Sequence, residues 1–146
     1  MDDWREITAE WQAGGAFIGS NASGGKVQMG TIGEQPGISP MELVLAALGG
    51  CTGGDVASTL EKKRQPLSAL KIRVRGKRSE TYPRVYTEIE VQYLLWGDGL
   101  DEEAVRQAIA LSEKKYCSVS AMLKTSVDVR FSYQILPSSS GENSEN

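Results

Sequence analysis

The sequence predicts an α+β fold in which a small antiparallel sheet comes first, a long helix follows, and a second sheet is accompanied by two further helices. Three observations predict it. Short apolar segments broken by glycine pairs occupy residues 4–32, a helical stretch begins at residue 39, and a period of two governs residues 70–95 and 127–135. The 146 residues suit one compact domain, which we expect over residues 1–137, with a disordered polar tail at 138–146.

The chain contains two cysteines, Cys51 and Cys117, and no histidine. Without imidazole there is no Ser-His-Asp triad, no Cys-His nucleophile pair and no ordinary His-rich zinc site. A thiol is the nucleophile that remains, because a helix N-terminus or a nearby cation can lower its pKa. We therefore expect thiol redox chemistry.

The net charge of -3 is small, and charges of both signs are interspersed. We expect no nucleic-acid partner and no membrane partner, since no apolar run approaches a membrane span. The first four residues, MDDW, lack the basic start and apolar stretch of a signal peptide. These features predict a cytoplasmic protein whose thiols are free, catalytic or redox-sensing.

The N-terminal segments at residues 7–11, 16–18 and 27–29 are predicted to be short antiparallel strands joined by glycine turns. A helix should then begin with Ser39 as its N-cap, Pro40 at the first helical position and Glu42 closing a capping box. It should run to about residue 64, where three basic residues suit the negative end of the helix dipole and Pro66 stops the chain from continuing.

Four glycines flank Cys51 in the segment LGGCTGGD, residues 48–55. Each glycine inside a helix costs about 1 kcal/mol relative to alanine, so we expect a compensating gain. Close approach of another backbone, such as a second helix crossing near the thiol, would supply it. The alternative is a helix break or tight crossing in which Cys51 is a small buried hydrophobic residue.

Residues 70–77 alternate basic and apolar side chains, and residues 85–95, after the turn at Tyr82-Pro83, alternate apolar side chains with Tyr86, Glu88, Glu90 and Gln92. The acidic outer face of the second strand should pair with the basic face of the first across a hairpin. This interpretation explains the basic stretch without nucleic-acid binding.

Asp101 should cap a second helix, whose apolar stripe consists of Val105, Ala108, Ile109 and Tyr116. A short third helix at residues 118–124 and a final strand at 127–135 complete the chain. Cys117 lies at the entrance to the third helix, where a lowered thiol pKa is expected from unpaired N–H groups and the helix dipole. Alternatively, Cys117 only fills the junction and Ser118 caps the helix.

Two segments resemble the cysteine motifs of the OsmC/Ohr family. Residues 39–52, SPMELVLAALGGCT, look like its first-cysteine helix, and residues 116–120, YCSVS, resemble its second-cysteine segment. The spacing of the cysteines and the order of elements match over roughly residues 4–136. The resemblance implies an OsmC-like fold and an intertwined homodimer whose central helices pack together, with each active site drawing on both subunits.

The resemblance also implies a thiol peroxidase of the oxidative or osmotic stress response that reduces organic hydroperoxides. Cys51 would be the peroxidatic cysteine and Cys117 the resolving cysteine, and an external dithiol would reduce their disulfide. No metal or bound cofactor is required.

Family peroxidases hold the thiolate with an N-terminal arginine and a glutamate on the long helix. The cations that could take the first role here are Arg5 and Lys26, and the family's glutamate position falls on Met41, next to Glu42. Glu42 is thus a catalytic candidate or a helix cap. Asp55, one turn after Cys51, shares its face and would raise a thiol pKa.

Two alternatives stay open from the sequence. One is a different thiol activity at the same pocket, such as disulfide exchange or reaction with another electrophile. The other is a non-catalytic protein that binds a small apolar molecule in an intersubunit pocket, lined by residues such as Met41, Leu48 and Met122.

Overall fold

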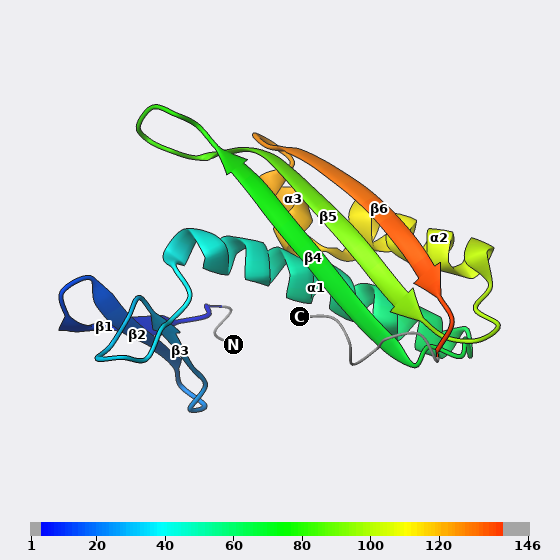
Figure 1. Cartoon of the computed structure of the whole chain (residues 1–146), viewed down its shortest axis with the longest axis horizontal. Helices are drawn as coiled ribbons and strands as arrows, with labels where there is room; N and C mark the ends of the chain where they lie inside the picture. The colour runs from blue at the N-terminus through cyan, green and yellow to red at the C-terminus, as the bar shows by residue number, and fades with distance from the viewer. Residues whose placement is uncertain (1–3, 139–146) are drawn as a thin grey trace. The chain divides into compact units, whose positions relative to one another are not determined.

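The structure is a computed structural model that describes residues 4–138 (Figure 1). The chain divides into two compact units between Val44 and Leu45, and the single domain expected over residues 1–137 stays a prediction. Of the predicted tail, residues 139–146 lie outside the described residues. Ser138 is described, and its hydroxyl donates to Asp98 Oδ2 at 2.6 Å.

The N-terminal unit contains the three predicted antiparallel strands, β1 (Ile7–Ala13), β2 (Ala16–Asn21) and β3 (Lys26–Met29), in the order β1-β2-β3. Gly14 turns the first hairpin with a positive φ of 54°. Every residue of β1 is exposed, including Ile7 and Trp11. The sheet therefore carries apolar side chains that its own strands do not cover.

Helix α1 (Pro40–Lys62) begins with the predicted capping box. Ser39 Oγ accepts a hydrogen bond from the Glu42 N–H at 3.1 Å, and Glu42 Oε1 accepts one from the Ser39 N–H at 2.9 Å. The helix ends two residues before the expected position, and Arg64 turns the chain with a φ of 57°. The Gln65 N–H then bonds the Leu60 carbonyl at 2.9 Å, as in a common helix-ending motif.

Helix α1 is long and apolar enough to cross a membrane, judged by length and composition. Only 28% of the most apolar window is buried in this chain. The expectation that no segment approaches a membrane span was wrong, because alanines and glycines keep the helix apolar without forming a continuous run of large side chains. A core helix of a soluble protein passes the same test, and the absence of a membrane partner stays a prediction.

The C-terminal unit contains a sheet of β4 (Ala69–Arg78), β5 (Tyr86–Trp96) and β6 (Asp128–Leu136), in the order β4-β5-β6. β4 and β5 form an antiparallel hairpin, whereas β5 and β6 are parallel. A parallel pair needs a crossover connection. Here α2 (Glu102–Leu111), a π-helical turn η1 (Ser112–Tyr116) and α3 (Ser118–Leu123) supply it.

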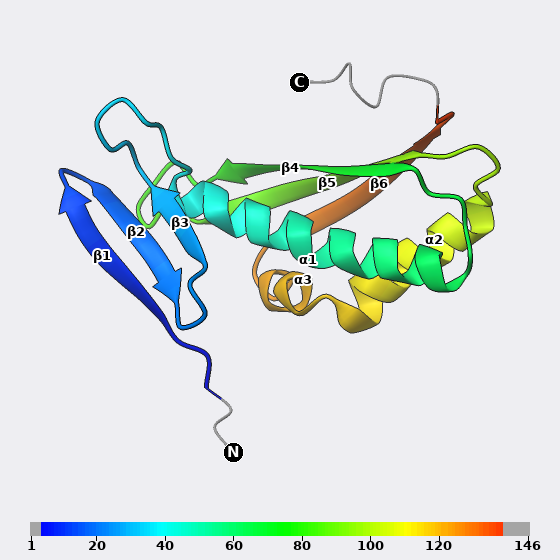
Figure 2. The ribbon, with the colours of Figure 1, turned by 90° about the horizontal axis from the view of Figure 1, so that it is seen from below.

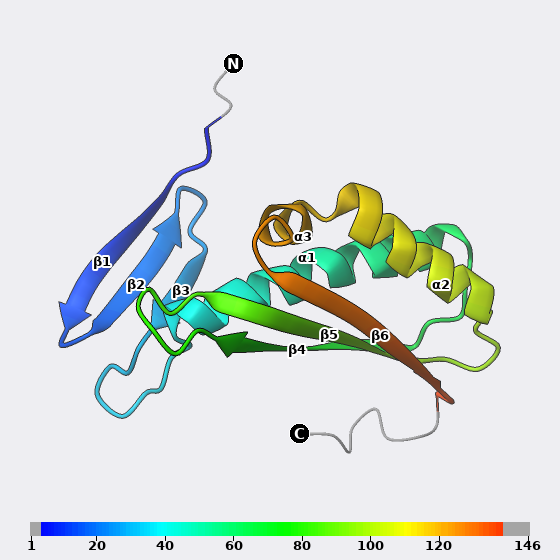
Figure 3. The same ribbon diagram turned by 90° about the horizontal axis from the view of Figure 1, so that it is seen from above.

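Within this unit, the helices lie on one face of the sheet, as Figure 2 and Figure 3 show. The core lies between the two layers and includes the fully buried Leu48 and Leu60 of α1 and Ile89 and Leu95 of β5. Burial of such side chains is the main stabilising contribution to a domain of this size. The mixed α+β fold predicted from the sequence is confirmed.

The predicted charge pairing across the hairpin is confirmed at its centre. Arg75 lies opposite Glu90, and its Nε donates to Glu90 Oε1 at 2.6 Å. Tyr86 was wrongly placed on the outer face, since it is only 6% exposed. A bulge between Lys77 and Arg78 shifts the register there. The Tyr86 ring covers Gly76, and a Cβ added to that glycine would stand 2.6 Å from Tyr86 Cδ1.

Asp101 caps α2 as predicted and accepts a hydrogen bond from the Glu103 N–H at 3.3 Å. The apolar stripe is confirmed for its α2 members and wrong for Tyr116, which is 52% exposed. The π-helical turn widens the helix after Leu111 and takes Tyr116 off the stripe. Ser112 is the next buried position of the stripe instead.

The glycines around Cys51 lie on two faces of an unbroken helix. A Cβ on Gly49 would stand 3.2 Å from Val74 Cγ2, and one on Gly53 would stand 3.0 Å from Ile72 Cγ1. These two glycines let α1 lie close to β4, so within the described chain the close neighbour is a strand rather than a second helix. Gly50 and Gly54 face open space.

Candidate active site

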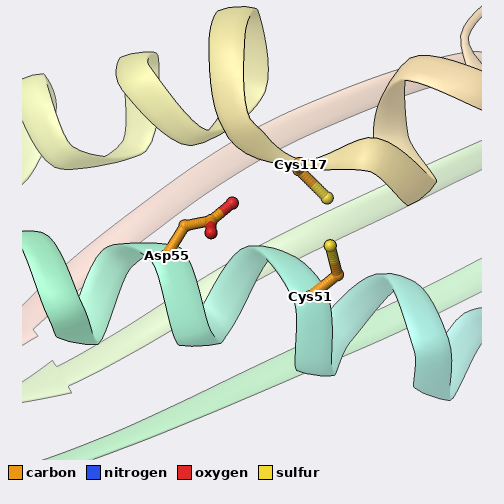
Figure 4. A group of neighbouring side chains, drawn as sticks. All are labelled: Cys51, Asp55 and Cys117. Carbon is orange, nitrogen blue, oxygen red and sulfur yellow. The ribbon is translucent and has the colours of Figure 1, made fainter. Parts of the chain in front are cut away.

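The fold brings Cys51, Cys117 and Asp55 together. The two sulfur atoms and a carboxylate oxygen all lie within 4.8 Å of one another, and both cysteines are free (Figure 4). Figure 4 shows the two thiols pointing toward each other, one from α1 and the other from the junction before α3. The predicted pair is therefore close enough for direct chemistry between its sulfurs.

Cys51 is the accessible member of the pair. It is half-buried in α1, next to Gly50, where an added Cβ would meet no other part of the described chain within 4 Å. Asp55 follows one helical turn later and shares the face of Cys51, as its spacing predicts.

Cys117 is the buried member, with 3% of its surface exposed. It is the N-cap of α3, and its Sγ accepts a hydrogen bond from the Ser120 N–H at 3.3 Å, so the cap is the thiol and not Ser118. Burial raises the pKa of Cys117 to about 11, against the lowering effect of the Ser120 N–H, and Cys51 and Asp55 raise it further. The expectation of a lowered pKa was wrong because desolvation outweighs the helix terminus.

A chain of buried hydroxyl groups ends at Asp55. Tyr93 Oη and Thr52 Oγ1 lie 2.5 Å apart, Thr52 Oγ1 and Ser112 Oγ lie 2.8 Å apart, and Ser112 Oγ donates to Asp55 Oδ2 at 2.9 Å. All three hydroxyl residues are fully buried.

The direction of this hydrogen-bond chain follows from its end. Ser112 uses its one hydroxyl hydrogen to donate to Asp55, so Thr52 donates to Ser112, and Tyr93 in turn donates to Thr52. Burial raises the pKa of Tyr93 to about 12, which keeps its proton in place at neutral pH. Three consecutive O–H groups thus run from Tyr93 to the carboxyl of Asp55, beside the two thiols.

Thr52, Ser112 and Tyr93 were missed as site residues by the sequence analysis. Weak signals were present: Thr52 directly follows Cys51, and Ser112 continues the spacing of Val105, Ala108 and Ile109. Tyr93 belongs to the apolar alternation of β5. A serine on an apolar stripe is the kind of exception that indicates a buried hydrogen bond.

A groove of about 520 Å³ begins at Asp55 and runs toward the end of α1. Its walls combine charged, hydroxyl and apolar side chains. They are Asp55, Ser58, Thr59, Lys62, Lys63, Leu111 and Tyr116.

The other predicted site residues lie elsewhere. Glu42 is engaged in the capping box, whose hydrogen bonds from the backbone and side chain of Ser39 lower its pKa. It precedes Cys51 by nine residues, about 13 Å along a helix, and its catalytic role stays a prediction. Arg5 and Lys26 are exposed residues of the N-terminal unit, and their role as the thiolate's cation also stays a prediction.

The residues predicted to line an apolar ligand pocket have different surroundings. Leu48 is fully buried in the core of its unit, so its proposed place in a pocket wall was wrong. Met122 is 75% exposed and Met41 is half-buried.

Comparison with known proteins gives consistent matches. A family model described as OsmC-like protein matches residues 33–132. Protein YhfA of Escherichia coli K12 is 38% identical over 131 residues, which cover 90% of this chain and 98% of YhfA. A crystal structure of a hypothetical protein from Aquifex aeolicus VF5 superimposes with a TM-score of 0.84 and 37% identity, covering 93% of this chain and 98% of that one.

A more distant match shares the fold. It is the Legionella pneumophila structure described as an organic hydroperoxide resistance protein OsmC and predicted redox protein. The match has a TM-score of 0.66 and 15% identity, and it covers 91% of this chain and 99% of the other.

Proposed function

This chain belongs to the OsmC-like protein family, and on that premise we propose that Cys51 and Cys117 form a redox-active dithiol that reduces organic hydroperoxides. The observation that supports the proposal is the approach of the two free sulfurs to within 4.8 Å. Cysteines at this distance can form a disulfide after a modest side-chain movement.

Cys51 attacks the peroxide, because it is the accessible thiol while Cys117 is buried with a raised pKa. The Cys51 thiolate attacks the terminal oxygen of R–O–OH and the O–O bond breaks. The alkoxide that leaves takes up the proton that the Cys51 thiol had released and becomes the alcohol. The sulfur loses two electrons and becomes a sulfenic acid.

Cys117 then attacks the sulfenic sulfur. A disulfide forms, the S–O bond breaks, and the departing hydroxide takes the Cys117 proton to leave as water. A carboxylate oxygen of Asp55 lies within 4.8 Å of both sulfurs, and we propose that it passes this proton from Cys117 to the departing oxygen. An external dithiol restores both thiols by disulfide exchange, so the cycle consumes one hydroperoxide and one dithiol.

The groove beside Asp55 favours an organic peroxide over hydrogen peroxide. Leu111 and Tyr116 offer apolar surface for the organic group, and both are substantially exposed. Hydrogen peroxide has no apolar part to gain from this surface.

We propose that the protein acts as a homodimer. Only 28% of the most apolar window of α1 is buried in one chain, and a Cβ added to Gly50 or Gly54 would meet no other part of the described chain within 4 Å. The N-terminal sheet likewise exposes Ile7 and Trp11. A second copy of the chain, which would cover both apolar surfaces, removes this area from water.

The first test measures thiol consumption in the reduced protein with cumene hydroperoxide and, separately, with hydrogen peroxide. We expect rapid loss of both thiols, faster with the organic peroxide, and a Cys51–Cys117 disulfide detected by mass spectrometry. Thiols that stay reduced with both oxidants would refute the peroxidase proposal. That result would favour a binding protein instead.

The dimer is tested by light scattering after size exclusion. Gly50→Gln adds a side chain where this chain leaves open space, so the unit itself should fold, whereas a closely packed second copy would be displaced. We expect a dimer mass for the native protein and a monomer mass for Gly50→Gln. Glu61→Gln, on the same helix, is the matched control and should remain dimeric. A native monomer would contradict the proposal.

A further inference from the structure

We propose that Cys51, Cys117 and Asp55 bind Zn²⁺ when both thiols are reduced. The two sulfur atoms and a carboxylate oxygen of these three side chains all lie within 4.8 Å of one another. This inference goes beyond the peroxidase, whose cycle uses no metal.

The geometry suits a tetrahedral zinc ion with one open position. Zinc binds thiolate sulfur at about 2.3 Å and carboxylate oxygen at about 2.0–2.2 Å, which places neighbouring ligand atoms about 3.5–3.8 Å apart. The present separations, which are at most 4.8 Å, exceed these values by at most about 1.3 Å, which side-chain rotation can supply. Cys51 and Asp55 are four residues apart in α1, so both ligands come from one rigid face.

The ligands are already oriented by buried hydrogen bonds. Ser112 Oγ donates to Asp55 Oδ2 and leaves Oδ1 available, and the Ser120 N–H donates to Cys117 Sγ. Both serines are fully buried. Such outer-shell partners are typical of metal sites, where they fix the direction of each ligand.

Charge and ligand type favour zinc over other ions. Among the described ion pairs of residues 4–138, none involves Asp55, so two thiolates and this carboxylate would place negative charge together without a paired cation. Two sulfurs exclude magnesium and calcium, which take oxygen ligands. The carboxylate disfavours the soft copper(I) ion, and zinc accepts both ligand types. Each thiol gives its proton to solvent on binding.

Zinc binding and disulfide formation then compete for the same sulfurs. By thermodynamic linkage, zinc should protect the thiols from oxidation, and oxidation should release zinc. The reduced protein would hold zinc, and hydroperoxide would free it.

The test titrates reduced protein with Zn²⁺ by calorimetry, without peroxide, and uses Co²⁺ as a spectroscopic probe for sulfur ligation. We expect one ion per chain and a thiolate-to-cobalt absorption band. Asp55→Asn should weaken affinity at least about 10-fold, and Cys51→Ser at least about 100-fold, given the size of ligand-shell effects. Glu61→Gln is the control for loss of a carboxylate on the same helix and should bind like the native protein.

Three results would overturn the inference: no stoichiometric binding, unchanged affinity in Asp55→Asn, or equal binding by the disulfide form of the native protein. The last comparison needs no variant and so does not depend on folding of a mutant. Peroxidase activity is measured in chelator-treated buffer, and therefore failure of one proposal leaves the other standing.

Discussion

The two cysteine segments differ in how they hold a thiol. Cys51 lies half-buried on a long helix whose Gly50 and Gly54 face open space, whereas Cys117 is buried and caps a short helix with its sulfur. The first environment favours encounter with a substrate and the second favours a fixed position. A hydrogen-bond chain through Thr52 and Ser112 connects the two segments. The difference teaches that burial, more than helix position, distinguishes the environments of two similar residues, and the roles proposed for them depend on it.

Replacing each cysteine in turn should have the largest effect and is the strongest test of the difference between the two segments. We expect Cys51→Ser to lower hydroperoxide reduction by at least about 1,000-fold, since the nucleophile is lost. Cys117→Ser should still consume one equivalent of peroxide in a single turnover and leave a sulfenic acid that a dimedone probe traps. Stopped-flow kinetics and mass spectrometry distinguish these results. Equal single-turnover rates in both variants would contradict the assigned roles.

Removing the link between the segments should lower stability. Thr52→Val keeps the shape of the side chain but leaves the buried hydroxyls of Tyr93 and Ser112 without a shared partner, at a cost of about 2–4 kcal/mol. Urea denaturation measures the free energy of unfolding. Thr59→Val, on the same helix, makes the same chemical change without breaking the chain, and a comparable loss in that variant would contradict the proposed linkage.

The buried thiol should make stability depend on pH. The pKa of Cys117 is raised from an ordinary 9.0 to about 11, so the folded protein holds the proton more tightly than the unfolded chain does. Its stabilising effect is full below about pH 9 and is lost as pH rises toward 11. Urea denaturation of reduced protein across this range should show the decline. Cys117→Ser should show a shallower decline, and an identical profile would count against a buried thiol.

The smallest effect should come from a second buried serine. Ser120 Oγ is fully buried and has no hydrogen-bond partner among the residues that the structure describes. Ser120→Ala should therefore change the free energy of unfolding by no more than about 1 kcal/mol, in the stabilising direction. Ser112→Ala, which breaks two hydrogen bonds, should destabilise by about 1–3 kcal/mol. A reversed order in thermal denaturation would show that the two hydroxyls are misassigned.

Much of the fold could be predicted from local patterns. The capping box at Ser39 and Glu42 and the alternation in β4 and β5 depend on neighbours in sequence, and these predictions were confirmed. Tyr86 and Tyr116 were misplaced because a bulge and a π-helical turn each shift the chain away from a regular period. Such irregularities arise from tertiary packing and have no clear local signature.

The candidate site was predictable in its cysteines and not in its surroundings. In a chain without histidine, the two cysteines are the evident candidates for a nucleophile. The raised pKa of Cys117 depends on how deeply the fold buries it, and the hydroxyl chain depends on contacts between α1, β5 and η1. Neither is a property of a sequence segment taken alone.

The parallel pairing of β5 with β6 has a consequence for biosynthesis. Cys51 and Cys117 lie 66 positions apart, and Cys117 belongs to the crossover that precedes β6 and connects it to β5. A chain leaving the ribosome presents Cys51 before the Cys117 segment exists. The nascent chain thus holds Cys51 without Cys117 until residue 117 has been made, and a chain that ends before residue 117 has no second thiol for Cys51 to meet.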